Sequence, residues 1–324
     1  MGELTEAIQP QAARAATVEV EDLVKRYRKG KTNAVDGISF SVRPGEFFAL
    51  LGPNGAGKTT TISILTTTLM PTAGRVRIGG HDVVTEASAV RRQVGIIFQN
   101  PSLDMNLTGE ENVRFHAVLY GLYPYRPQFR LMPTAYRRQV AELAALLNIE
   151  SDIFRPIKTL SGGTRRKLEI VRSLMHRPAV LFLDEPTRGL DTNGRRNLWQ
   201  YLRGVQAEGT TVFLTTHYLE EAEGADSVCI INKGRVVASG APARIKGELV
   251  TEYLLLDAED RDRLRAELMQ RQVTFSETPL FRIALDGMNA HQLLKAIETP
   301  LSVVRVHQPS LEDAYLSIIG AGDE

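Results

Sequence analysis

Hydrophobic and polar residues alternate in two early segments of the chain, and short continuous apolar runs follow them. Residues 17–27 and 34–42 show the alternation, which predicts two antiparallel strands around a turn at residues 29–33. Residues 46–51 form an apolar run that stops at a glycine, a pattern typical of a strand buried on both faces. Further short runs predict strands at residues 180–183, 211–215 and 228–232.

Between these strands, apolar residues recur at helical spacing. The spacing predicts helices at residues 59–69, 110–120, 134–147, 162–175 and 194–208. Prolines interrupt the pattern in residues 121–133, so we expect a loop there. Residues from about 100 to 177 thus predict a helical subdomain. Strands that alternate with helices indicate an α/β fold whose central sheet is mostly parallel.

The length of 324 residues allows one large domain and a smaller one. Residues 1–16 are rich in Ala, Gln and Glu and predict a flexible tail, residues 17–240 the large domain, and residues 241–324 a small α+β domain. In the small domain the pattern is close to a split βαβ arrangement. Its strands are expected at residues 252–256, 273–277, 280–285 and 301–306, and its helices at residues 259–270, 289–298 and 310–319.

Composition narrows the classes of function. The 39 Lys and Arg residues balance 38 Asp and Glu residues, which gives no electrostatic reason to expect nucleic acid or an anionic lipid surface as a partner. Cys229 is the single cysteine, so an intrachain disulfide is excluded, and its apolar surroundings indicate a buried thiol. No apolar run reaches the roughly 20 residues that span a bilayer, so a membrane role would require a partner.

A glycine-rich segment carries the strongest chemical signal. It matches the pattern G-x-x-x-x-G-K-[ST] between a predicted strand and a predicted helix. Its glycines allow backbone N–H groups to converge on phosphate oxygens, its lysine supplies a cation, and its first threonine supplies a hydroxyl for Mg²⁺. The segment consists of Gly52, Pro53, Asn54, Gly55, Ala56, Gly57, Lys58, Thr59 and Thr60. We therefore expect a site for a nucleoside triphosphate with Mg²⁺.

Two carboxylates follow a buried apolar strand. Asp184 and Glu185 come directly after residues 180–183, at the edge of the sheet where ligands bind in such folds. Asp184 is placed to hold Mg²⁺, and Glu185 to polarise an attacking water as general base. A polar strand terminus is the alternative, but the neighbouring phosphate loop favours the functional interpretation.

The order of short motifs along residues 17–245 resembles the ATP-binding cassette family. Similar positions in that family carry an adenine-stacking aromatic residue, a Q-loop glutamine, the signature sequence, a D-loop aspartate and a switch histidine. The matching residues here are Tyr27, Gln99, Ser161, Gly162, Gly163, Asp191 and His217. Thr164 stands where the family usually has a glutamine. This departure puts the transmission of motion to a partner in doubt, but not the hydrolysis of ATP.

The resemblance implies a P-loop NTPase cassette, with a mixed sheet core and a helical subdomain, that binds ATP and Mg²⁺ and hydrolyses ATP. It further implies that Gln99 contacts Mg²⁺ or water, and that His217 contacts the γ-phosphate. Two copies would pair head to tail, with Ser161–Gly163 of one facing the ATP of the other. Other interpretations remain for three of these residues: a packed strand tyrosine for Tyr27, a structural histidine for His217 and a plain helix N-cap for Ser161.

Three segments, at residues 165–170, 187–191 and 311–316, resemble the daunorubicin-resistance group of ABC-2 type exporter ATPases. That group pairs the ATPase with a separate permease, which implies a peripheral location on the cytoplasmic face of the cell membrane. Residues 121–133 are then either a permease contact or an ordinary surface loop. The cations at 165–167 are expected to be solvated or to face an interface.

Two other functions explain the pattern less completely. A soluble cassette ATPase that acts on ribosomes or DNA is the alternative, but the balanced charge and the single phosphate loop argue against it. A small-molecule kinase would leave the signature at Ser161–Gly163 unexplained. The compound transported is expected to be selected by the permease.

Overall fold

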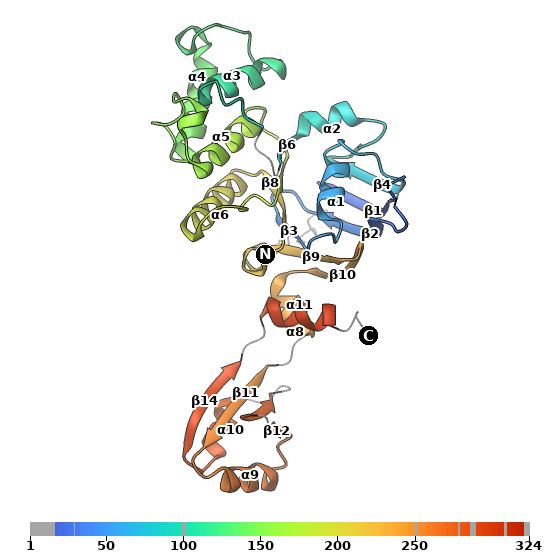
Figure 1. The fold of residues 1–324 in the computed structure, drawn as a ribbon, viewed down its shortest axis with the longest axis vertical. Helices are drawn as coiled ribbons and strands as arrows, with labels where there is room; N and C mark the ends of the chain where they lie inside the picture. Colours follow the sequence, from blue (N-terminus) through green and yellow to red (C-terminus); the bar gives the residue numbers. More distant parts are fainter. Residues whose placement is uncertain are drawn as a thin grey trace, which may run out of the picture. The chain divides into compact units, whose positions relative to one another are not determined.

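The computed structural model describes residues 17–28, 30–98, 102–249, 252–277, 279–285, 290–307 and 310–320. The chain forms two compact units, the first ending at Ser239 and the second beginning at Gly240 (Figure 1). The predicted tail at residues 1–16 lies outside the described residues. Within the described ranges, none of the helices combines the length and the apolar character needed to cross a membrane.

The first unit contains a six-stranded sheet that positions the chemistry. Its strand order is β10-β9-β3-β8-β7-β6, and the pairs β9–β3, β3–β8, β8–β7 and β7–β6 are parallel, as predicted. Four strands match predicted ones: β3 (Phe47–Leu51), β7 (Val180–Asp184), β8 (Thr211–Thr216) and β9 (Ser227–Asn232). Two were not predicted: β6 (Val94–Ile97), which has only four residues, and β10 (Arg235–Gly240), which buries none of its residues fully.

A second sheet of the first unit is antiparallel, in the order β2-β1-β4-β5. Strands β1 (Val18–Lys25) and β2 (Val35–Val42) pair as the alternation predicted, with Val18 opposite Val42. Strands β4 (Ala73–Ile78) and β5 (His81–Asp82) were not predicted. One hydrophobic cluster contains buried residues of both sheets. It includes four phenylalanine rings whose neighbouring centroids lie 5.0 to 6.0 Å apart, from Phe40, Phe48, Phe182 and Phe213.

Helices of the first unit surround these sheets. Four lie near the strands: α1 (Lys58–Leu65), α2 (Ala87–Gln93), α6 (Thr192–Ala207) and α7 (Leu219–Glu223). Three gather in the predicted helical region: α3 (Gly109–Leu119), α4 (Thr134–Leu146) and α5 (Gly162–Leu174) (Figure 1). Between them, residues 121–133 contain only the 3-10 turn Phe129–Leu131, and a second such turn lies at Ile157–Thr159.

Helix α1 ends four residues earlier than the apolar spacing predicted. Thr66 caps it, donating its hydroxyl to the carbonyl of Ile62 at 2.8 Å. Thr67 then adopts a left-handed backbone with φ of 61°. Threonine side chains that bond the backbone compete with the helical ladder, which explains the early end.

The thiol of Cys229 is fully buried in β9, as predicted. Burial raises the pKa of Cys229 to about 12. The thiol is therefore protonated and unreactive at neutral pH.

The second unit is built on a four-stranded antiparallel sheet in the order β12-β13-β11-β14. This order, with one helix after β11 and another after β13, is the split βαβ arrangement that the pattern indicated. The strands are β11 (Tyr253–Ala258), β12 (Phe275–Glu277), β13 (Phe281–Ala284) and β14 (Leu301–His307). The helices are α8 (Pro242–Leu249), α9 (Arg261–Gln270), α10 (Ala290–Ala296) and α11 (Leu311–Gly320), of which α8 was not predicted.

Candidate functional site

The glycine-rich loop connects the end of β3 to the start of α1. Gly57 has a φ of 109°, a conformation that L side chains rarely adopt. A Cβ atom there would lie 2.5 Å from the carbonyl oxygen of Ala34. At Gly52 a Cβ atom would collide with the carbonyl oxygen of Ile231. Gly52 and Gly57 are thus required by close backbone packing, and Gly57 by the turn as well.

Lys58 is the cation of this loop, and it is buried, with only 5% of its surface exposed. Its Nζ donates hydrogen bonds to the carbonyls of Gly52 at 2.7 Å and Pro53 at 3.1 Å. Burial lowers the pKa of Lys58, and the nearby carboxylates of Glu185 and Asp184 oppose that change. A phosphate oxygen would compete with the two carbonyls for the same ammonium group.

Asp184 ends β7 beside the first turn of α1. Its carboxylate is buried, and Oδ1 accepts a hydrogen bond of 2.5 Å from the hydroxyl of Thr215 on the neighbouring strand β8. The hydroxyl oxygen of Thr59 lies 3.5 Å from the same Oδ1. A carboxylate and a hydroxyl side by side are the hard oxygen ligands that Mg²⁺ prefers, so these residues fit the ion.

Glu185 follows with a left-handed backbone, at a φ of 44°. Its backbone N–H donates to the hydroxyl of Thr215 at 3.0 Å. Its Oε1 lies 3.4 Å from Nδ1 of His217 and 3.8 Å from Nζ of Lys58. Non-glycine residues held in this conformation cost roughly 1–3 kcal/mol and cluster at functional sites. The structure therefore brings Lys58, Asp184, Glu185 and His217 together, although they are distant in sequence.

Lys58, Glu185 and His217 border one open cavity of about 480 Å³, together with other residues of the loop from Asn54 to Thr60. Tyr27 lies beside it, with its hydroxyl 3.2 Å from the hydroxyl of Thr60. Tyr27 is 47% exposed and lies beyond the end of β1, so it is not the packed strand tyrosine of the alternative interpretation. Its role in stacking on a base stays a prediction.

The signature residues lie at a different place. Ser161 caps the N-terminus of α5, where its Oγ accepts a hydrogen bond of 3.1 Å from the backbone of Thr164. Ser161, Gly162 and Gly163 share a cavity of about 550 Å³ with Asp191, the N-cap residue of α6. This cavity has no lining residue in common with the cavity at the phosphate loop. Gln99 lies outside the described residues.

Two features near the site were missed or misjudged from the sequence. Thr215 bonds both Asp184 and Glu185, and no local motif singles it out. Arg166 was expected in a cluster that is solvated or faces an interface. It is instead buried, pairs with Glu169 at 2.9 Å and donates to the carbonyl of Phe98 at 2.6 Å. The spacing of Arg166 and Glu169, three residues apart on one helix, is a signal that could have identified the pair.

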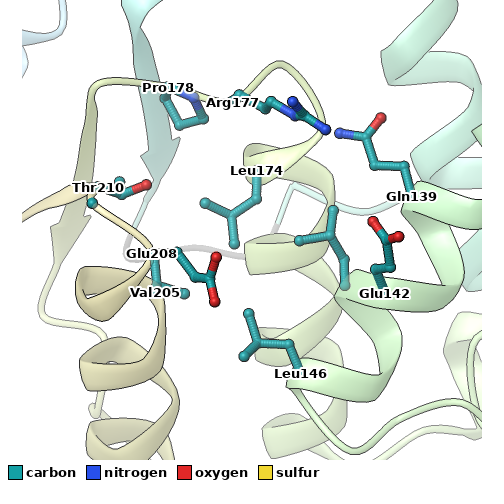
Figure 2. Close-up of a pocket in the computed structure, with 11 residues that line it drawn as sticks. Gln139, Glu142, Leu146, Leu174, Arg177, Pro178, Val205, Glu208 and Thr210 are labelled. Atoms are coloured by element: carbon teal, nitrogen blue, oxygen red, sulfur yellow. The ribbon is translucent and has the colours of Figure 1, made fainter.

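A larger groove of about 810 Å³ lies elsewhere in the first unit, between α4, α5 and α6 (Figure 2). Its floor includes Leu146, Leu174 and Val205, and Glu142 and Glu208 project from opposite walls (Figure 2). It contains none of the residues predicted for the site.

Comparisons with known proteins agree with this geometry. Residues 35–188 match the family described as ABC transporter. The chain is 37% identical over 310 residues to the Nod factor export ATP-binding protein I of Paraburkholderia xenovorans, covering 94% of this chain and 97% of that protein. It is 38% identical over 315 residues to the daunorubicin/doxorubicin resistance ATP-binding protein DrrA of Streptomyces peucetius, covering 94% of this chain and 92% of that protein.

Solved structures show the same fold. An ATP-binding subunit of an ABC transporter aligns with a TM-score of 0.62 at 32% identity, over 72% of this chain and 92% of that one. A dimeric ATP-binding cassette in a post-hydrolysis state, bound to ADP and Pi, aligns with a TM-score of 0.60 at 26% identity, over 69% of this chain and 98% of that one. The predicted cassette fold is confirmed, and the chain belongs to the ABC transporter family, as an ATP-binding subunit that hydrolyses ATP to power an exporter.

Proposed function

We propose that residues Gly52–Thr60 bind the phosphates of ATP, with Lys58 pairing the outer phosphates. Thr59 and Asp184, together with Gln99, would hold Mg²⁺, which supplies charge neutralisation at the phosphates when it is bound. Tyr27 would stack on the adenine ring. The single observation that carries this proposal is the convergence of a buried lysine and two strand-end carboxylates on one glycine loop.

Glu185 is the general base in this proposal. It accepts a proton from water as the water oxygen attacks the γ-phosphorus, and the bond from that phosphorus to the bridging oxygen of ADP breaks. His217 donates a hydrogen bond to the γ-phosphate. The 3.4 Å separation of Glu185 Oε1 and His217 Nδ1 supports a shared site for the two side chains.

The variant Lys58→Ala tests the nucleotide site. We expect the dissociation constant for ATP with Mg²⁺ to rise at least about 30-fold, because the variant loses a charge-assisted contact to phosphate. Isothermal titration calorimetry on the full-length chain measures this constant. The matched control is Lys158→Ala, at an exposed lysine outside the cavity. Equal binding by Lys58→Ala and the parent would remove the loop from the phosphate site.

The active form would be a head-to-tail pair of two copies, in which Ser161, Gly162 and Gly163 of one copy face the ATP held by the other. The separate positions of the loop cavity and the signature cavity support this arrangement. Dimeric cassettes among the structural relatives support it as well. Asp191, which lines the signature cavity, would lie at the junction between the copies.

A separate permease would transmit the motion across the membrane, with this chain bound peripherally at the cytoplasmic face. Relatives named for Nod factor export and for daunorubicin resistance support an ABC-2 type exporter of drugs, lipids or other hydrophobic or glycosylated compounds. The formal net charge of +1 gives no support to the alternative of a partner in the ribosome or in DNA.

Exposed apolar side chains support a permease contact along α3 and residues 121–133. Leu119 is 84% exposed and Tyr125 50% exposed, and the ring of Phe115 stacks on that of Tyr125. We expect Leu119→Ser/Tyr125→Ser to keep the basal ATP hydrolysis of the chain and to lose co-purification with the permease. Met269→Ser, at another exposed apolar residue in the second unit, is the control. Undiminished co-purification of the double variant would assign these residues to an ordinary surface loop.

A further inference from the structure

The buried carboxyl group of Glu221 has no part in the mechanism proposed above. Glu221 lies on α7, the helix that begins directly after His217 and Tyr218. It is only 5% exposed. Its Oε2 accepts a hydrogen bond of 2.6 Å from the hydroxyl of Thr216. Its Oε1 is buried, and the hydroxyl of Thr187 acts on the same carboxyl group. Burial of a carboxyl group is costly unless polar partners compensate for the lost water, so the presence of Glu221 calls for a specific reason.

The hydrogen bonds of Thr216 connect the residues on either side of His217 and also reach Glu221. Thr216 is the last residue of β8 and immediately precedes His217. Because its hydroxyl donates to Glu221, its oxygen accepts from the backbone N–H of Tyr218, at 2.9 Å. His217 therefore lies between two residues, Thr216 and Tyr218, that are hydrogen-bonded to each other, and its Nδ1 lies 3.4 Å from Oε1 of Glu185.

Three other groups face the same carboxyl group. Burial raises the pKa of Glu221, while the hydroxyls of Thr187 and Thr216 and the charges of Arg195 and His217 oppose the rise. Thr187 lies two residues after Glu185. The guanidinium of Arg195, on α6, lies 4.7 Å from the ring centre of Tyr218. The carboxyl group thus lies where the turn at His217, the segment after Glu185 and α6 meet.

We infer that Glu221 is a positioning residue that acts through Thr216 to hold His217 in reach of the γ-phosphate. Glu221 is not among the residues that line the cavity at the phosphate loop. The inference rests on the role proposed for His217 above. It predicts that loss of the Thr216–Glu221 bond slows hydrolysis and leaves the affinity for ATP unchanged, because the phosphate loop itself is untouched.

The test compares four single variants of the full-length chain. Glu221→Ala and Thr216→Val each remove one side of the bond, whereas Glu221→Gln keeps an oxygen that accepts from Thr216. Glu220→Ala changes the adjacent exposed glutamate and is the matched control. Steady-state phosphate release gives kcat, and titration with ATP and Mg²⁺ under non-hydrolysing conditions gives the dissociation constant.

We expect kcat to fall roughly tenfold in Glu221→Ala and in Thr216→Val, as the loss of one positioning hydrogen bond implies, with nucleotide affinity within about twofold. Glu221→Gln should keep most of the parent kcat, and Glu220→Ala all of it. In the double variant Glu221→Ala/Thr216→Val, kcat should fall no further than in either single variant, because the two residues act through one bond. Thr216→Val preserves the shape of the buried side chain, so it remains informative if Glu221→Ala fails to fold.

Additive effects of the two changes, or an unchanged kcat in Thr216→Val, would overturn the inference. A parallel fall in kcat and nucleotide affinity would do the same, since it indicates a general structural defect. His217→Ala separates this result from the proposed function. If His217→Ala keeps the parent kcat, the role of His217 itself is wrong; if it lowers kcat while Thr216→Val does not, only the positioning role of Glu221 fails.

Discussion

Replacing Glu185 with glutamine separates nucleotide binding from hydrolysis. The change keeps the size of the side chain and removes its charge and its basicity. The side chain of Glu185 is only 11% exposed. Its Oε1 lies 3.8 Å from the ammonium nitrogen of Lys58. At an effective dielectric constant of about 20, an opposite-charge pair at that distance attracts by about 4 kcal/mol before the cost of desolvation is subtracted.

Neutralising Glu185 releases Lys58 from this attraction and also removes a negative charge that would face the triphosphate. Both effects favour the bound nucleotide, so ATP should bind Glu185→Gln at least as tightly as the parent. Hydrolysis should slow by about 10²–10⁴-fold, the range typical of a lost general base, which corresponds to about 2.7–5.5 kcal/mol in the activation free energy.

Two measurements on the full-length chain decide this prediction. Calorimetric titration with ATP and Mg²⁺ gives the affinity, and phosphate release under saturating ATP gives kcat. Glu208→Gln, at an exposed glutamate after α6, controls for the loss of one carboxylate. A kcat within about threefold of the parent would refute the base role, and a loss of affinity that matches the loss of kcat would show that Glu185 binds nucleotide instead.

Two further predictions concern pairing of the chains and the stability of the second unit. Ser161→Ala/Gly163→Asp should leave ATP binding by the monomer intact and abolish ATP-driven pairing in light scattering, and an unchanged dimer would place the cross-copy site elsewhere. Burial would raise the pKa of Glu267, but hydrogen bonds from Glu298, Thr299 and Arg271 lower it to about 2. The ionised carboxylate of Glu267 therefore stabilises the folded second unit fully above its ordinary pKa of 4.5. This stabilisation is lost as the pH falls towards 2. Hydrogen exchange at the amides of Glu298 and Thr299 should be faster in Glu267→Gln than in the parent at about pH 7, and a difference that does not shrink as the pH falls towards 2 would contradict this assignment.

The sequence predicted those parts of the site whose residues are adjacent along the chain. The loop from Gly52 to Thr60 and the pair Asp184–Glu185 each lie within one short segment, bounded by a buried strand. Because parallel strands end at the same edge of a sheet, their meeting followed from the fold class. Thr215 could not be found in this way, because its bonds reach about 30 residues back in the sequence and depend on the register of β7 and β8.

The elements that were missed have physical reasons in common. Strand β6 is four residues long, β5 only two, and β10 alternates between half-buried and exposed residues without a fully buried one. Such segments carry too few buried side chains for periodicity to mark them, and pairing with neighbouring strands stabilises them instead. The burial of Arg166 was missed for a similar reason, because it depends on contacts with Glu169 and with the backbone carbonyl of Phe98.

The end of β8 shows how one strand can serve two polar networks. Successive side chains of a strand point to opposite faces, so Thr215 and Thr216 cannot share a partner. Thr215 bonds Asp184 and the backbone of Glu185, while Thr216 bonds Glu221. His217 comes next and reaches Glu185, which Thr215 already orients. A change in the register of β8 by one residue would therefore exchange the two networks and disconnect the histidine from the carboxylate, although every residue type stayed the same. The position of this strand within the parallel sheet, more than any single motif, makes the site possible.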